Sequence, residues 1–312
     1  MQLKTWAYIF LAAGRFIMRK AEKFWIPWLF LLPALTILIA FTIYPIVCGS
    51  ALAFFKFSLL SYDSSGSLIP PRFTGIDNFC RLFHDKYFHT AIKNSLLYVL
   101  IVPILQIVSV VLARLLKDET AFSALARTAL YIPVITSSVV VGIVWKWLLK
   151  TDGFANQILS FISGGAIKPV PWLTDTDTAI FSVMLVTLWQ GVGYYLILYL
   201  ASLQAVPREL EEHAALEGAS PLQIFLKIEL PLIKPAAAVC SLLSLISALK
   251  VFTEIYIITG GGPQGSTLTA SYYIYTTAFE YFDMGYAAAI ALLLAAVIAI
   301  ASLAHRLVFK SE

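Results

Sequence analysis

The sequence predicts an all-α membrane protein with about six transmembrane helices. Of its 312 residues, 60% are hydrophobic and 13% are charged, whereas ordinary soluble domains are about 45–50% apolar. The mean hydropathy of +0.83 supports the same class. A transmembrane helix needs about 20 mainly apolar residues, while a transmembrane β-barrel would show short segments of alternating polarity. The apolar segments of suitable length are residues 25–55, 91–116, 128–149, 178–204, 236–258 and 285–308, which we expect to form one domain, 25–308.

The segment before the first span, residues 1–24, predicts a helix on the membrane surface. Arg15, Arg19 and Lys23 recur every four residues and therefore share one helical stripe, opposite three apolar residues. An amphipathic helix of this kind lies in the membrane interface. A cleaved signal peptide is not expected, because the apolar run 6–13 is short and a basic residue soon follows it.

Basic residues near the span ends predict that both termini are cytoplasmic. Lysines and arginines precede the first span, separate the second from the third, flank residues 206–235 and follow the last span. The long loop after the first span is also basic, but the loop before the last span carries Glu280 and Asp283 without any base. Residues 309–312 are then a cytoplasmic tail. Because topology accounts for the net charge of +4, no nucleic-acid partner is expected.

The polar insert at residues 206–235, between the fourth and fifth spans, predicts two short helices. The first runs from Pro207 to Glu217, and its early glutamates face the positive helix end. Gly218 supplies the left-handed backbone that ends a helix. Ser220 begins the second helix, because a proline follows it and a glutamine lies three residues on, which is a capping-box pattern.

An apolar edge on this second helix predicts a contact surface for a cytoplasmic partner. A soluble helix-turn-helix is the alternative, but a surface that reads DNA would be basic, and this insert has more acids than bases. The edge consists of Leu222, Ile224, Phe225 and Ile228, and Leu230-Pro231 is expected to end the helix.

The insert resembles the EAA loop of bacterial ABC importer permeases, which seats in a cleft of an ATPase subunit. The resemblance rests on Glu212-His213-Ala214, Glu217-Gly218-Ala219, the spacing from Gly218 to Ile228, and Leu230-Pro231. His213 replaces the usual alanine, and Glu217 stands where aspartate is commoner. The residues to which the resemblance gives a coupling role are Glu212, Ala214, Glu217, Gly218, Ala219, Phe225, Ile228, Leu230 and Pro231.

The sequence carries no recognisable catalytic, cofactor or metal site. A glycine-rich phosphate loop ending in Lys-Ser or Lys-Thr is missing, and the run 260–263 lacks that lysine, so ATP and Mg are expected on a separate ATPase chain. The four histidines and three cysteines have no ligand-like spacing. We expect Cys48, Cys80 and Cys240 to be packing residues. An intramembrane enzyme stays open, because catalytic triads need not be contiguous in sequence.

Two spans carry the polar and aromatic groups expected of a solute path. The fourth contains the run 189–195, WQGVGYY, whose rings can stack on a sugar and whose amide and phenol groups can bond its hydroxyls. The alternative is that this run serves helix packing through its glycines. For Gly193 and Tyr195, the sequence does not distinguish packing from a place in the solute path. The fifth span contains Lys250 and Glu254, and charges at membrane depth are costly unless paired or hydrated. These two residues either pair across one helical turn or line a wet cavity.

A second resemblance concerns residues 252–267, FTEIYIITGGGPQGST, which are similar to the segment after the fifth core span of carbohydrate permeases of the maltose and glycerol-phosphate importer type. The resemblance covers most of the chain after about residue 25. Its further matching positions are residues 75–79, Asn94-Ser95, the segment from Arg127 to Pro133, Tyr275 and Phe279. A basic residue is common at the Lys250 position of this group, so it does not by itself indicate an anionic solute. The expected path comprises Gln190, Gly191, Tyr194, Ser244, Ser247, Ala248, Lys250 and Val251, all but Gln190 and Lys250 by similarity to the maltose permease.

Ala248 and Val251 replace side-chain amides of the maltose permease, and an apolar side chain cannot bond a sugar hydroxyl. This difference argues against maltose itself as the solute. The sequence names neither the sugar nor its charge.

The resemblances imply a type I ABC importer permease fold in a bacterial cell (inner) membrane, Gram-negative or Gram-positive. They imply a sugar, oligosaccharide or related glycosidic solute, a second permease subunit in a heterodimer, two ATPase subunits and an extracytoplasmic solute-binding protein. One alternative keeps this machinery but carries glycerol phosphate, a polyamine or an oxyanion. Another is an ion-coupled secondary transporter that uses Lys250 and Glu254 as a relay.

Overall fold

The computed structural model describes residues 25, 27–62, 67 and 69–309, which separate into two compact units. The first unit contains a helical stretch over Pro27–Leu52 that is long and apolar enough to cross a membrane. It includes the π-helical turn η1 (Ile39–Ile43) and the helix α2 (Tyr44–Leu52), and it corresponds to the first expected span. The surface helix expected at residues 1–24 and residues 310–312 of the expected tail lie outside the described residues.

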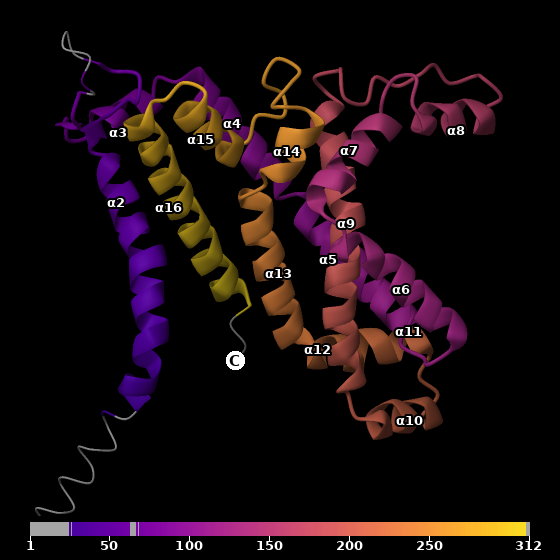
Figure 1. The fold of residues 1–312 in the computed structure, drawn as a ribbon. Helices are drawn as coiled ribbons and strands as arrows, with labels where there is room; N and C mark the ends of the chain where they lie inside the picture. Colours follow the sequence, from indigo (N-terminus) through magenta and orange to yellow (C-terminus); the bar gives the residue numbers. More distant parts are fainter. Residues whose placement is uncertain (1–24, 26, 63–66, 68, 310–312) are drawn as a thin grey trace, which may run out of the picture. The chain divides into compact units, whose positions relative to one another are not determined.

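The second unit begins at Ala53 and consists mainly of helices (Figure 1). A short antiparallel pair, β1 (Phe55–Lys56) and β2 (Arg72–Phe73), lies near its start. In Figure 1, α10 and α11 lie at one end of this unit, and α3, α8 and α15 lie at the other. Its helical elements are α3 (Asp77–Leu82), α4 (Lys86–Tyr98), α5 (Ile101–Leu115), α6 (Ala121–Ile135), α7 (Ser138–Leu148), α8 (Phe154–Ile162), α9 (Ala179–Gln204), α10 (Arg208–Leu216), α11 (Pro221–Ile224), η2 (Phe225–Glu229), α12 (Leu230–Leu232), α13 (Lys234–Leu249), α14 (Thr253–Ile258), α15 (Ala270–Phe279) and α16 (Met284–Val308).

Three of the expected spans correspond to long apolar helical segments of this unit. They are Lys86–Leu115, which joins α4 and α5, then α9 and α16. By length and composition the described chain has four such helices, or up to six if each of two bent helix pairs forms one span. One bent pair is α6 with α7, and the other joins Pro221–Leu232 to α13 at 73°. The expected number of six spans is reached when each pair is counted as one span.

The third and fifth expected spans are each interrupted in the structure. The third consists of α6 and α7, which meet at 101°. Pro133 lies inside α6, where it removes a backbone donor, and the chain then turns extended at Thr136 (ψ 140°) and Ser137 (ψ 126°). The break between these helices follows from this local chemistry.

The expected span 236–258 is interrupted after Leu249, where α13 ends. Neither proline nor glycine lies at this break, so the sequence contains no helix-breaking residue that would have revealed it. A non-helical backbone at membrane depth needs partners for its freed polar groups. The Thr269 hydroxyl donates to the buried carbonyl of Val251 at 3.1 Å and thereby satisfies one of them.

Gly193 permits a direct backbone contact between α9 and α6. A Cβ atom at this position would lie 2.0 Å from the carbonyl oxygen of Leu130. Because α9 runs unbroken through Gly193, the glycine serves close packing instead of a bend. This observation favours packing over a place in the solute path for Gly193.

One carboxylate joins three helices at the end of the unit that carries α3 and α15. Asp85 caps α4 by accepting a hydrogen bond from the Tyr87 N–H at 2.9 Å. Its other oxygen accepts hydrogen bonds from the hydroxyls of Tyr273 in α15 (2.5 Å) and Tyr286 in α16 (2.6 Å). The segment Asn94-Ser95 strengthens the same end, because Asn94 donates to the carbonyls of Gly265 and Leu268, and Ser95 accepts from a backbone N–H.

Candidate functional site

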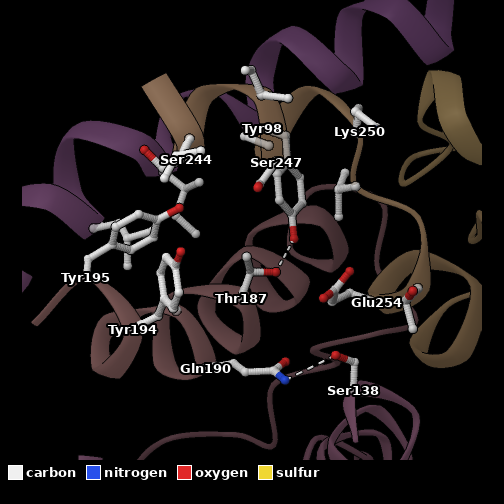
Figure 2. Close-up of a pocket in the computed structure, with 18 of the residues that line it drawn as sticks. Tyr98, Ser138, Thr187, Gln190, Tyr194, Tyr195, Ser244, Ser247, Lys250 and Glu254 are labelled. Atoms are coloured by element: carbon white, nitrogen blue, oxygen red, sulfur yellow. Dashed lines mark hydrogen bonds between the residues drawn. The ribbon is translucent and has the colours of Figure 1, made fainter. Parts of the chain in front are cut away.

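The second unit contains a cavity of about 600 Å³, which we call the central cavity (Figure 2). Its lining comes from α4, α5, α6, α7, α9, α13, α14 and the break at 250–252. All eight residues of the expected solute path belong to this lining, although their contact with a solute stays a prediction. They are Gln190, Gly191, Tyr194, Ser244, Ser247, Ala248, Lys250 and Val251.

The α9 wall of the central cavity forms hydrogen bonds with the neighbouring helices (Figure 2). The side-chain amide of Gln190 donates to the Ser138 hydroxyl at 3.2 Å and to the carbonyl of Pro133 at 3.4 Å. One turn earlier, the hydroxyls of Thr187 and Tyr98 lie 2.5 Å apart. Gln190 therefore also supports the break between α6 and α7.

The α13 wall contains both fixed and accessible polar groups. The buried Ser244 hydroxyl accepts a hydrogen bond from the Gln106 amide at 2.9 Å and donates to the carbonyl of Ser241 at 3.0 Å. Tyr199 donates to the same Gln106 at 2.7 Å. Ser247, by contrast, is exposed in the second unit. A ligand would therefore meet the Ser247 hydroxyl more readily than that of Ser244.

Lys250 and Glu254 do not form the helical pair that was one of the two sequence alternatives. Lys250 follows the end of α13, whereas Glu254 lies in the first turn of α14. No ion pair joins them within the part of the chain that the structure describes. Both side chains line the central cavity, as the other alternative required.

Residues 206–235, the polar loop, form the expected pair of short helices. Gly218 has a φ of +87°, and the capping box is present, with Ser220 accepting from the Gln223 N–H and Gln223 accepting from the Ser220 N–H. Two details were wrong. Ile224 is buried instead of lying on an exposed edge, and helical structure continues through Pro231 to Leu232, because the widened turn η2 precedes the proline.

The residues with an expected coupling role differ in exposure. Exposed members are Glu212, Glu217, Gly218 and Pro231, whereas Ala214, Ala219, Phe225, Ile228 and Leu230 are half-buried. A hollow of about 290 Å³ in the polar loop is lined by five of them, Ala214, Glu217, Gly218, Ala219 and Ile228, together with Gln223, Ile224 and Lys227. The polar loop thus has a concave surface, and its role in coupling stays a prediction.

A charge cluster that the sequence analysis missed attaches the polar loop to α5. Glu229 is fully buried and forms ion pairs with Arg114 (2.6 Å) and Lys117 (2.8 Å). Lys117 also pairs with Glu211 of α10. Arg127 of α6 donates to the carbonyls of three residues that follow α5, at 116–118. The cluster therefore holds both parts of the polar loop against one helix end.

Other missed residues belong to the central cavity, namely Tyr98, Ser138 and Thr187. Helical spacing could have identified Thr187, because it lies three residues before Gln190 on the same face. Within the described chain no cluster of potential metal ligands is found. Cys240 is buried, as expected of a packing residue, but Cys48 and Cys80 are exposed within their units, so the expectation was wrong for these two.

Comparisons with known proteins extend over most of the chain. Residues 106–311 match the family described as binding-protein-dependent transport system inner membrane component. The probable ABC transporter permease protein YurN of Bacillus subtilis is 36% identical over 290 residues, covering 92% of this chain and 96% of YurN. The lactose transport system permease protein LacF of Rhizobium radiobacter is 32% identical over 280 residues, covering 88% and 91% of the two chains.

A solved structure shares the fold. It is a bacterial alginate ABC transporter in complex with an alginate pentasaccharide-bound periplasmic protein. One chain of that structure matches this protein with a TM-score of 0.77 and 25% sequence identity, over 92% of this chain and 95% of the other.

Proposed function

The chain belongs to the family of binding-protein-dependent transport system inner membrane components, and from this premise we propose that its central cavity is the route of a sugar or related glycosidic solute. The observation that carries the proposal is the lining of the cavity by hydroxyl, amide and aromatic groups from several helices. Aromatic rings stack on the apolar faces of sugars, and amides and hydroxyls bond sugar hydroxyl groups. Relatives described as permeases for lactose and for multiple sugars support the same solute class.

In this proposal the chain is one of two permease subunits, forms a heterodimer and works with two ATPase subunits. The chain carries no glycine-rich phosphate loop, so ATP hydrolysis belongs to the partner ATPases. An extracytoplasmic binding protein delivers the solute; the solved alginate transporter, which contains a periplasmic protein, supports this part. The polar loop and both termini are then cytoplasmic, and the chain spans a bacterial cell membrane.

The polar loop is the proposed contact with the ATPase. Its hollow, lined in part by Gly218 and Ile228, offers a concave surface, and Glu212 of α10 is exposed. A movement of the ATPase pair would move the loop, and the ion pairs of Glu229 would pass that movement to α5. Alternating access by rocking of helices around a central site is the general scheme for such transporters.

Reconstitution in liposomes tests the proposal. The complex of both permeases and the ATPases, with the binding protein outside and ATP inside, is expected to take up neutral disaccharides such as lactose, trehalose or melibiose. A complex without ATPase is the control and should take up none. Uptake of an oxyanion or polyamine but of no glycoside would refute the sugar route. Uptake by this chain alone, driven by an ion gradient, would refute the dependence on partner ATPases.

A further inference from the structure

The carboxylate of Glu254 has no hydrogen-bond or ion-pair partner among the other described residues. It lies in the first turn of α14 and lines the central cavity. No hydrogen bond or ion pair from another described residue reaches its side chain, and its one hydrogen bond is to its own backbone N–H. In Figure 2 the carboxylate points toward Thr187, with Gln190 and Ser138 on the same side of the cavity.

The two polar groups of α9 that lie near Glu254, those of Thr187 and Gln190, already form hydrogen bonds with other residues. The Thr187 hydroxyl bonds Tyr98 and the carbonyl of Val183, and the Gln190 amide bonds across to Ser138. Lys250 belongs to the lining of the same cavity but forms no ion pair with Glu254. An ionised carboxylate accepts hydrogen bonds through two oxygens and donates none. The free oxygens of Glu254 can therefore accept hydrogen bonds from donors that enter the cavity from outside this chain.

We propose that Glu254 is a specificity-determining residue that accepts hydrogen bonds from hydroxyl groups of the transported sugar. The inference deepens the proposed function and rests on it. Hydroxyl groups supply the missing donors, and hydrogen bonds to a charged acceptor are stronger than those between neutral groups. A carboxylate or sulfonate of a solute would be repelled at the same place. The part of the solute that meets α14 is thus a neutral, hydroxyl-bearing sugar unit.

Glu254→Ala and Glu254→Gln in the reconstituted complex test this inference, with Glu119→Gln as the control. Glu119 is an exposed acid between α5 and α6, outside the cavity. The disaccharide that the unmodified complex transports best is compared with its series of monodeoxy analogues at subsaturating concentration. Because every complex uses the same binding protein, the ratio of variant to wild-type uptake for each analogue cancels the preference of that protein.

Glu254→Ala is expected to lower uptake of the parent disaccharide about tenfold to about 100-fold, the loss of one hydrogen bond to a charged group. For one or two monodeoxy analogues the loss should disappear, because the hydroxyl that bonded Glu254 is already missing. Glu254→Gln, which retains one acceptor, should show a smaller loss, and Glu119→Gln should show none.

Four outcomes would overturn the role of Glu254 while leaving the sugar route intact. They are wild-type uptake by Glu254→Ala, an equal loss for the parent and all of its analogues, failure of the variant to assemble with its partner permease, and a sodium requirement of wild-type uptake that disappears in Glu254→Gln. The last result would assign the carboxylate to a cation. Failure of the unmodified complex to move any disaccharide would instead refute the proposed function itself.

Discussion

Neutralising Glu229 should destabilise the attachment of the polar loop. Glu229→Gln keeps the size of the side chain but removes the charge that faces Arg114 and Lys117. The two cations then remain close together without their shared, fully buried counter-ion. Lys117 still pairs with Glu211, so Arg114 bears most of the effect.

The expected magnitude follows from burial and distance. At 2.6 and 2.8 Å, each charge pair is worth about 6 kcal/mol of Coulomb energy at an effective dielectric constant of about 20. Much of this energy offsets the cost of removing the ions from water, and breaking a buried pair typically costs about 3–5 kcal/mol. Because Arg114 and Lys117 keep 27% and 13% of their side-chain surface exposed, we expect the lower value, about 3 kcal/mol.

The assay is the free energy of unfolding of the purified chain in mixed micelles, titrated with a denaturing detergent. Glu211→Gln is the matched control, because it removes a partly exposed carboxylate from the same cluster and should cost about 1 kcal/mol or less. Combining Glu229→Gln with Arg114→Gln should recover part of the loss, since the unpaired cation is then removed. The reasoning is refuted if Glu229→Gln costs no more than Glu211→Gln, or if the double variant shows simple additivity.

Three further substitutions test other parts of the structure. Gly218→Asp should leave membrane insertion intact but abolish transport and capture of the ATPase. A side chain is strained in the left-handed backbone conformation at this position (φ +87°), and a charge enters the proposed contact. Normal transport with a bound ATPase would contradict this prediction. Gly193→Ala should lower the free energy of unfolding by about 1–3 kcal/mol, since its Cβ would overlap the Leu130 carbonyl, and an unchanged detergent midpoint would contradict the helix contact. For Asp85, burial raises the pKa, but hydrogen bonds from two tyrosine hydroxyls and the backbone outweigh it and lower the pKa from 3.8. The difference in free energy of unfolding between the wild type and Asp85→Asn should therefore be largest above about pH 3.8. It should vanish as the pH falls through the lowered pKa of Asp85, and a difference that persists at lower pH would disprove this linkage.

Local chemistry allowed the polar loop to be predicted in detail, because glycine, proline and capping residues act over a few positions. Gly218 and Ser220 do in the structure what their types indicate. The residues of α9 and α13 that were expected in the solute path line the central cavity, since one helical face brings Gln190, Gly191 and Tyr194 together, and their contact with a solute stays a prediction.

Long-range pairing could not be predicted in the same way. Glu229 lies in a polar segment where a solvated acid is the ordinary interpretation, and its partners Arg114 and Lys117 are more than 100 residues away. The break after Leu249 carries no proline or glycine, and its support comes from Thr269, in a different segment. Both features depend on which helices meet, and a hydropathy pattern contains no information about that.

The position of α5 connects these observations mechanically. Arg114 in its last turn forms an ion pair with the buried Glu229. Gln106 lies about 12 Å along the same helix, by the rise of about 1.5 Å per residue. It forms hydrogen bonds with Tyr199 and with Ser244, which lines the central cavity. An uninterrupted helix transmits an axial displacement with little loss, because every turn is held by backbone hydrogen bonds. Movement of the polar loop must therefore either break a buried ion pair or shift the Gln106 contacts. Since breaking the pair costs about 3 kcal/mol or more, shifting the cavity wall is the less costly response.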